Sequence, residues 1–217
     1  ASLLRQYRLH VVKDEVAIAV DKWFKDAGDE TLRLEYPLTP DSVVVDLGGY
    51  KGDFAAAIHM KYGCHVYLFE PVKRFYSECV RRFDGNAKIK CFNYGLSSQN
   101  GTFLISDEDN GSSLVKSTTS GNCERVVVRS FQEAIAELDL PQIDLLKVNV
   151  EGAEFRILPH ILSTGLIGKI RYLQVQFHNF FPNANTLRDD IRKTLSKTHV
   201  EQWNYPFVWE SWARKQR

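Results

Sequence analysis

The sequence has few of the features that cross-link small secreted proteins or anchor membrane proteins. Its 217 residues include four widely spaced cysteines, without a Cys-x-x-Cys pair and without a histidine at ligand spacing: Cys64, Cys79, Cys91 and Cys123. We interpret them as reduced, mostly buried thiols, since free cysteine is commonly a core residue. No apolar run approaches the roughly 20 residues that a membrane span needs. Neither a disulfide scaffold nor a membrane-spanning protein is indicated.

An excess of charge of either sign is also lacking. Lysine and arginine number 28 against 27 aspartates and glutamates, a formal net charge of +1. Because non-specific nucleic-acid binding normally requires a basic excess, we expect no nucleic-acid partner. Charges are spread through residues 1–20, so this stretch lacks the apolar core of a secretory signal. We therefore expect a cytoplasmic location, although a leader removed before Ala1 stays open.

Short apolar runs alternate with helix-like stretches along most of the chain. This rhythm predicts an α/β fold, a doubly wound Rossmann-like parallel sheet with helices on both faces. The expected strands cover residues 42–47, 65–69, 88–94, 144–150 and 170–177. The expected helices cover residues 9–24, 53–61, 74–83, 131–138, 154–163 and 186–196.

Two segments depart from this rhythm. Between residues 101 and 129 the pattern changes to strand-like alternation around Ser, Thr and Gly, which predicts an inserted β-ribbon with a mobile tip near residues 106–123. The tail, residues 200–217, is rich in aromatic residues and is expected to close the sheet antiparallel. We expect one domain, with an N-terminal helical extension (1–40), a ligand-binding core (43–178) and a C-terminal helix and aromatic tail (179–217).

The strongest local signal is a glycine-rich turn between the strand at 42–47 and the following helix. It contains Gly48, Gly49 and Gly52, which let a backbone approach a ligand beside the free amides of a helix N-terminus. The turn is not a P-loop, because Lys51 is not followed by Ser or Thr. Asp46 would repel a pyrophosphate and suits a ligand with a cation or hydroxyls. A tight turn without a ligand is the alternative.

An acidic residue follows the next strand. Glu70 lies eighteen residues beyond Gly52, and Pro71 ends that strand. A carboxylate in this place can accept both hydroxyl protons of an adenosine ribose, as in dinucleotide-binding folds. We therefore predict recognition of a ribose with a free 2′-hydroxyl, against the plainer interpretation of a helix-capping or solvated glutamate.

Two later strands carry polar side chains at every second position. Residues i, i+2 and i+4 of a strand face one side, so each set forms a column, whereas central parallel strands are normally apolar. If the two strands are adjacent, the columns converge at the carboxyl edge, where open α/β sheets bind ligands. The alternatives are that a column satisfies neighbouring backbone or that a strand lies at the sheet edge. The columns are Lys147, Asn149 and Glu151, and Gln174, Gln176 and His178.

These segments resemble the signature blocks of FkbM-type methyltransferases, which use S-adenosylmethionine. The matching blocks are residues 46–54, 69–71, 144–154 and 176–178, and the similarity spans about residues 43–178 and the Trp-rich tail. The resemblance implies the seven-stranded methyltransferase sheet with its last strand antiparallel. It also implies the methionine part of the cofactor near Asp46, Gly48 and Gly52, its ribose at Glu70 and its adenine near Gly95. The candidate cofactor-binding residues are Asp46, Gly48, Gly49, Tyr50, Gly52, Glu70, Gly95 and Asn149.

The chain departs from the family pattern at two positions. The family usually has Asp where this chain has Asn149, and often Glu where it has Gln176. Hard divalent cations prefer carboxylate oxygens, so we expect no metal. The same departures count against a base at position 149.

The resemblance implies O-methylation, in which a hydroxyl loses its proton. We expect His178 to be the general base, because its ordinary pKa lies near neutrality; Glu151 is the alternative base or orients the histidine. The acceptor is expected to be a small molecule or a sugar or glycan. Several aromatic residues are able to stack on it, although we favour a place in the core or in a homo-oligomer interface: Phe180, Phe181, Trp203, Tyr205 and Trp209.

Two other functions stay open. A nicotinamide-dependent oxidoreductase or epimerase also needs a glycine turn and a ribose-binding acid, but Asp46 and the absence of any Tyr-x-x-x-Lys pair count against it. A catalytically degenerate methyltransferase fold that binds a partner is the non-enzymatic alternative, and it rests on Asn149 and Gln176.

Overall fold

The computed structural model describes residues 14–106, 123–180 and 182–216. The first part of the expected helix 9–24 lies outside these residues, as do Phe181 and most of the expected ribbon tip. The described part forms α2, Glu15–Lys25, which begins where Asp14 Oδ1 accepts hydrogen bonds from the amides of Val16 and Ala17.

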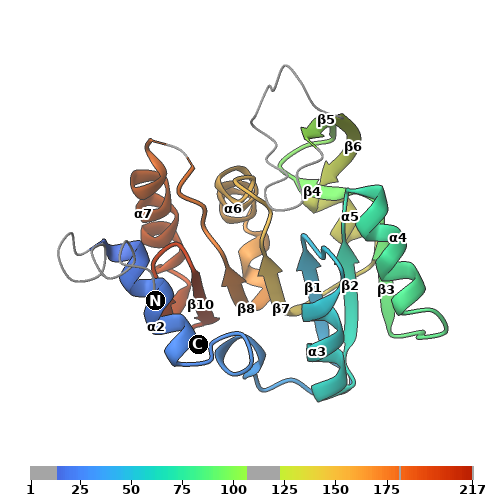
Figure 1. Cartoon of the computed structure of the whole chain (residues 1–217), viewed down its shortest axis with the longest axis horizontal. Helices are drawn as coiled ribbons and strands as arrows, with labels where there is room; N and C mark the ends of the chain where they lie inside the picture. Colours follow the sequence, from blue (N-terminus) through green and yellow to red (C-terminus); the bar gives the residue numbers. More distant parts are fainter. Residues whose placement is uncertain (1–13, 107–122, 181, 217) are drawn as a thin grey trace, which may run out of the picture.

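A seven-stranded sheet forms the centre of the molecule (Figure 1), in the order β3-β2-β1-β7-β8-β10-β9. β10 runs antiparallel to both of its neighbours, and the other pairs are parallel. The predicted doubly wound, Rossmann-like sheet with an antiparallel last strand is thereby confirmed. The strands are β1 (Val43–Leu47), β2 (His65–Phe69), β3 (Ile89–Phe92), β7 (Ile143–Val148), β8 (Ile170–Val175), β9 (His199–Tyr205) and β10 (Trp209–Arg214).

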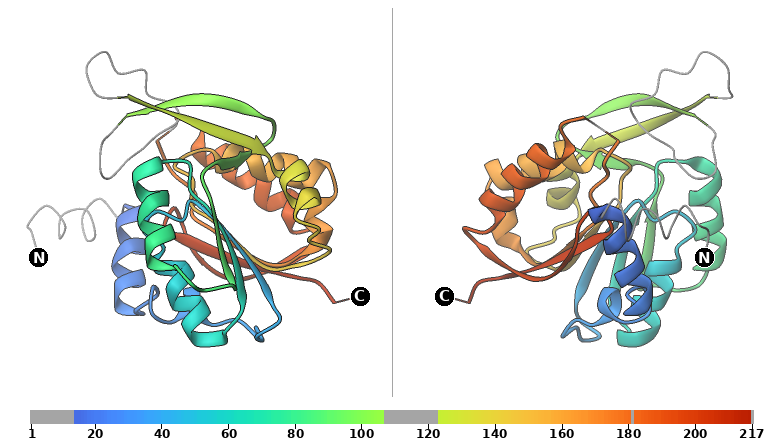
Figure 2. Two further views of the ribbon diagram at one scale, coloured as in Figure 1. Left: turned by 90° about the vertical axis from the view of Figure 1, so that its right-hand side faces the viewer. Right: turned by 60° about the vertical axis from the view of Figure 1, so that its left-hand side comes forward.

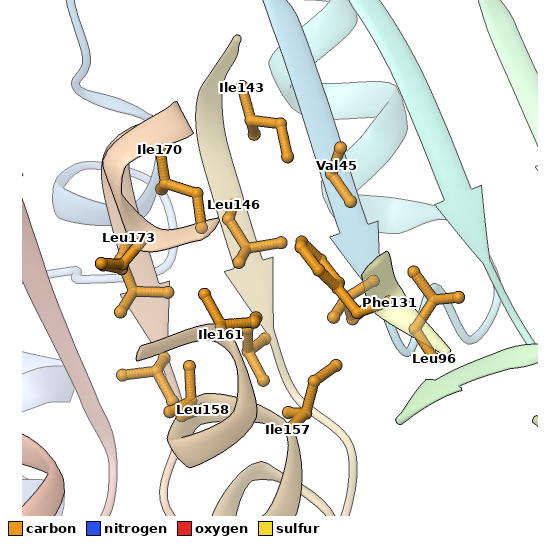
Figure 3. Close-up of a cluster of buried hydrophobic side chains, with 14 of the residues drawn as sticks. Val45, Leu96, Phe131, Ile143, Leu146, Ile157, Leu158, Ile161, Ile170 and Leu173 are labelled. Carbon is orange, nitrogen blue, oxygen red and sulfur yellow. The ribbon is translucent and has the colours of Figure 1, made fainter. Parts of the chain in front are cut away.

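Helices cover both faces of the sheet because the inner strands are apolar on both sides. On one face Val45, Leu146 and Leu173 pack with α5 (Phe131–Glu137), α6 (Glu154–Ser163) and α7 (Ala184–Leu195); Figure 3 shows the part of this core beneath α6. On the other face Val44 and Leu145 pack with α3 (Asp53–Tyr62) and α4 (Lys73–Arg82). The two cores hold β1 and β7 in the middle of the sheet.

The inserted segment forms a second, three-stranded sheet of β4 (Gly95–Ser97), β5 (Gly101–Ser106) and β6 (Cys123–Ser130), in the order β4-β6-β5. The predicted ribbon is present as β5 and β6, which lie over one end of the main sheet (Figure 2). The predicted strand 88–94 ends earlier, at Phe92, because the chain bends at Asn93 and Tyr94 and continues as β4. Val72 and Phe75 pack against Ile105 and Val126, which attaches the small sheet to α4.

The aromatic tail forms the hairpin of β9 and β10, and its aromatic side chains are buried or half-buried. Tyr205 and Trp209 are buried with Trp23 of α2, whose ring centroid is 5.1 Å from that of Tyr205. Trp203 packs partly buried against the same cluster. The interpretation of these three rings as core residues therefore holds.

The other expectations about composition concern cysteines and membranes. Cys64 and Cys79 are buried and Cys91 is half-buried, all as free thiols; the side chain of Cys123 lies outside the described residues. Within the described ranges, every helix is too short or too polar to cross a membrane.

Candidate functional site

The segments singled out by the sequence meet at the carboxyl edge of the sheet. Leu47, the last residue of β1, pairs with Phe69 of β2 on one side and with Val148 of β7 on the other, and Val148 pairs with Val175 of β8. The four loops that follow these strands therefore lie side by side at the edge where open α/β sheets bind ligands.

Gly95 reaches this edge from the small sheet. It begins β4, and a Cβ atom at this position would lie 3.5 Å from Pro71 Cγ, so Gly95 stays close to the loop that follows β2. Although the chain bends after β3, Gly95 thus lies beside the loop that begins at Glu70.

Close packing requires glycine at two positions of the turn after β1, Gly48 and Gly49. Gly48 has φ +77°, and a Cβ atom there would lie 1.8 Å from the carbonyl oxygen of Asn149. At Gly49 a Cβ atom would lie 2.3 Å from Leu68 Cγ. The amides of both glycines donate to the carbonyl of Phe69. The turn is pressed against β2 and against the loop after β7, which leaves no room for side chains.

Glu70 is buried beside this turn. Its Oε2 accepts a hydrogen bond of 2.8 Å from the Tyr50 amide, and its Oε1 accepts one of 2.9 Å from the Val72 amide. Burial raises the pKa of Glu70 to about 7, against the effect of these two hydrogen bonds and of the charge on Lys147. The predicted ribose acceptor thus lies where expected, with an ionisation state that changes near neutral pH.

Tyr50 is held in an unusual backbone conformation next to Glu70. Its φ is +49°, in the left-handed region that non-glycine residues seldom adopt. The half-exposed ring packs on Phe75 at 4.3 Å between centroids, and the carbonyl accepts a hydrogen bond from Cys79 Sγ. Strain of this kind concentrates at functional sites, in keeping with the predicted place of Tyr50 at the cofactor.

Asp46 and Lys147 form a buried ion pair across β1 and β7. Lys147 Nζ lies 2.8 Å from Asp46 Oδ1 and donates a hydrogen bond of 2.7 Å to the Gly48 carbonyl. Burial lowers the pKa of Lys147, and the charge of Asp46 opposes that shift. The lysine thus neutralises the carboxylate and also fixes the turn that follows it.

Two buried oxygens beside this ion pair lack donors. Asp46 Oδ2 and Asn149 Oδ1 have no hydrogen-bond partner within the part of the chain that the structure describes. A buried acceptor without a partner costs about 1 to 3 kcal/mol. Because these two unpartnered oxygens lie near the ends of adjacent strands, they are suited to bind a ligand that has N–H or O–H donors.

In the second polar column, the residue farthest from the carboxyl edge, Gln174, has a structural role. Gln174 accepts a hydrogen bond from Arg33 Nε and donates to the Arg33 carbonyl and to the Tyr36 hydroxyl. Tyr36 in turn shares a hydrogen bond with Ser211 of β10. Gln174 therefore has a structural role, although two of its three partner atoms belong to side chains rather than to the neighbouring backbone of the alternative interpretation. Gln176, one step nearer the edge, is half-buried.

His178 lies between two carboxylates. Its Nδ1 is 3.0 Å from Glu154 Oε1 and its Nε2 is 3.5 Å from Glu151 Oε2. Burial alone would lower the pKa of His178, but the hydrogen bonds and charges of Glu151 and Glu154 outweigh it and raise the pKa to about 9. His178 therefore lacks the near-neutral pKa expected for it and carries a proton at neutral pH. Phe180, 54% exposed, packs against its ring.

Glu154 has no predicted role, although it is the last residue of the matching block 144–154. It is the first residue of α6 and is fully buried. An acidic residue in the first turn of a helix is ordinarily a favourable dipole contact, so its residue type alone indicates no special role. The signal along the chain that could have found it is its place two residues after Gly152.

No group of three or more His, Cys, Asp or Glu side chains within the described ranges is arranged to hold a metal ion. The expectation of a metal-free site stays a prediction that rests on Asn149 and Gln176.

Known proteins resemble the chain in sequence pattern and in fold. The model of the methyltransferase FkbM domain matches residues 46–207, whereas no curated protein matches the chain. A putative rRNA methylase from Clostridium thermocellum is 8% identical with a TM-score of 0.51, over 87% of this chain and 96% of that one. An rRNA methylase from Streptococcus thermophilus is 11% identical with a TM-score of 0.50, over 88% and 95%. A fibrillarin/Nop5p complex contains a chain that is 8% identical with a TM-score of 0.53, over 83% and 76%. At these identities the structures share the fold alone.

Proposed function

This chain belongs to the FkbM methyltransferase family, is an S-adenosylmethionine-dependent methyltransferase, and, we propose, methylates a hydroxyl oxygen of a small molecule or sugar. One observation carries the finer part of the proposal. Glu151 and His178 form a charged pair at the carboxyl edge, beside the loops of the glycine turn and Glu70. Methylation of an alcohol requires a group that takes up the hydroxyl proton. Binding of the cofactor alone does not require such a group.

The proposed cofactor site is the part of the edge after β1 and β2. S-adenosylmethionine supplies a methyl group activated on a sulfonium. We assign its binding to Asp46, Gly48, Gly49, Tyr50, Gly52, Glu70, Gly95 and Asn149. The unpartnered oxygens of Asp46 and Asn149 support this assignment, because the cofactor brings an ammonium group. Glu70 supports it as a buried acceptor for ribose hydroxyls.

The acceptor hydroxyl would give up its proton to the pair formed by Glu151 and His178. With a pKa of about 9, His178 already carries a proton at neutral pH. Glu151 is therefore the proposed proton acceptor at that pH, and the imidazolium of His178 holds the carboxylate in place. His178 itself takes this role only where the pH is high enough to deprotonate it. Alignment of the reacting atoms and exclusion of water supply the rest of the rate enhancement.

The proposed acceptor is small and uncharged. The net charge of +1 supports an acceptor that is not a polyanion, so nucleic acid is not proposed. The burial of Tyr205 and Trp209 counts against an acceptor that stacks on the tail, and equally against a homo-oligomer formed through these two rings. The exposed ring of Phe180 lies 5.0 Å from the His178 ring between centroids, which supports a place for Phe180 beside the acceptor. We also propose that the chain is a single domain, that it acts in the cytoplasm and that its activity requires no metal ion.

Calorimetry and a transfer assay test this function. We expect S-adenosylhomocysteine to bind with micromolar affinity and NAD not to bind. We then expect methyl transfer from labelled S-adenosylmethionine to some member of a panel of sugars and polyketide alcohols, with chelator present, and none to RNA. Methyl transfer to RNA alone would overturn the proposed acceptor. Cofactor binding without transfer to any hydroxyl would support the degenerate binding protein instead.

A further inference from the structure

A single buried carboxylate connects the two loops of the proposed acceptor side. Glu154 is fully buried, and its oxygens accept three hydrogen bonds from two loops. Oε2 accepts from the Gly152 amide at 2.8 Å. Oε1 accepts from the His178 amide at 2.9 Å and lies 3.0 Å from His178 Nδ1. Both oxygens of Glu154 therefore accept hydrogen bonds from the protein itself, and the side chain is shielded from solvent.

The loop before α6 is shaped around this carboxylate. Glu151 has φ +49° and Gly152 has φ +97°, so two consecutive residues are in conformations that L side chains seldom adopt. The Gly152 amide in this bend is one of the donors to Glu154. By holding Gly152, Glu154 stabilises the bend that places Glu151 Oε2 3.5 Å from His178 Nε2.

Glu154 favours hydrogen on Nδ1 in the neutral form of His178, because its carboxylate lies 3.0 Å from Nδ1 whereas Glu151 lies 3.5 Å from Nε2. A carboxylate only accepts hydrogen bonds, so the contact with Glu154 requires a hydrogen on Nδ1. The amide of His178 donates to the same oxygen, which fixes the backbone and the ring together. Nε2 is then the ring atom turned toward Glu151.

We propose that Glu154 is a positioning residue that holds His178 with its hydrogen on Nδ1 and with Nε2 directed toward Glu151 and the acceptor. This inference rests on the proposed function for the identity of the reacting group. The tautomer and the ring orientation of His178 can be measured on the protein alone, without a methyl acceptor.

Nitrogen-15 NMR of histidine-labelled full-length chain tests the proposal. Comparison with His178→Gln assigns the ring signals among the six histidines. In the native chain we expect a midpoint near pH 9 and, above it, the neutral form with hydrogen on Nδ1. In Glu154→Gln, which removes the charge of this side chain, we expect the midpoint to fall by at least one pH unit. An unchanged midpoint in Glu154→Gln that still binds S-adenosylhomocysteine would overturn the proposal.

Asp144→Asn is the matched control. It removes one carboxylate from the opposite end of β7, where Asp144 binds the Val43 amide, and should leave the His178 signals unchanged. If Glu154→Gln fails to fold, the native chain still decides, because a neutral form with hydrogen on Nε2 contradicts the proposal. With an acceptor in hand, kcat should fall in Glu154→Gln while KM changes little. A shifted midpoint in a chain that methylates no hydroxyl would keep the positioning role and overturn the proposed function instead.

Discussion

The loops after β1 and β2 and the loops after β7 and β8 lie at the same sheet edge but are built in different ways. In the first pair, glycines are pressed against neighbouring segments and Glu70 is held by backbone amides. In the second pair, Glu154 also accepts from two backbone amides, those of Gly152 and His178, but the His178 ring lies between the carboxylates of Glu154 and Glu151. The first region depends on backbone shape, and the second depends on charge balance between side chains.

The difference follows from what each region does in the proposed function. A cofactor shared by many enzymes is recognised by a turn whose form depends on a few glycines, whereas proton transfer requires groups whose charges are set by one another. Substitutions that add atoms should therefore damage the first region, and substitutions that remove a charge should damage the second.

Gly48→Ala should have the largest effect. The new Cβ atom would lie 1.8 Å from the Asn149 carbonyl oxygen, at a φ of +77°. We therefore expect the free energy of unfolding to fall by about 4 kcal/mol and the binding of S-adenosylhomocysteine to be lost. Gly165→Ala is the control, with φ +74° and no atom within 4 Å of the added Cβ; it should cost only about 1 to 2 kcal/mol. Chemical denaturation and calorimetry measure both. Equal costs in the two variants would show that backbone conformation, not packing, requires Gly48.

Glu151→Gln should lower kcat by about 10² to 10⁴-fold while S-adenosylhomocysteine binds normally, because the proposed proton acceptor is removed. The pH profile of the native enzyme separates the two candidate bases. If Glu151 accepts the proton, kcat stays level between pH 7 and 9. If neutral His178 is required, kcat rises with pH until about 9, the raised pKa of His178. Normal turnover in His178→Ala, with the cofactor bound, would remove the histidine from the mechanism.

Gln174→Leu should destabilise the fold without changing the acceptor side. It removes the partners of Arg33 and Tyr36, so we expect a loss of about 1 to 3 kcal/mol in the free energy of unfolding. Gln176→Leu, the next residue of the same column, should have little effect on stability. Urea denaturation of the two variants makes the comparison, and a larger loss at Gln176 would contradict the structural role of Gln174.

Changes at Glu70 should have the smallest effect. Ribose hydroxyls donate to an ionised carboxylate, and burial raises the pKa of Glu70 to about 7, so the cofactor should bind more tightly as the pH rises through 7. Between pH 6 and 8 we expect the Kd of S-adenosylhomocysteine to fall about tenfold. Glu70→Gln should abolish this pH dependence and weaken binding at pH 8. A native Kd that stays constant over this range would contradict the role of Glu70.

The two regions also differ in how far the sequence predicted them. Asp46, the glycines and Glu70 stand within 25 residues of one another, and their places follow from one strand, one turn and the next strand. Glu154 and Gln174 were not understood from the sequence, because their partners belong to other segments that only the folded sheet brings alongside: His178 after β8 for the first, and Arg33 and Tyr36 before β1 for the second. The role of His178 was predicted from an ordinary pKa, which its two carboxylate neighbours change.

The sequence by itself determined the alternation of strands and helices, the glycine turn, the acid after β2 and the family. These depend on periodicity and on neighbours in the chain, where the chemistry is local. Only the tertiary structure decided which polar residues are structural and which nitrogen of His178 faces Glu151. It also decided that the tail aromatics Tyr205 and Trp209 are buried with Trp23. The reason is physical: burial and charge pairing arise when strands distant in sequence become neighbours, and those two effects set pKa values and hydrogen-bond partners.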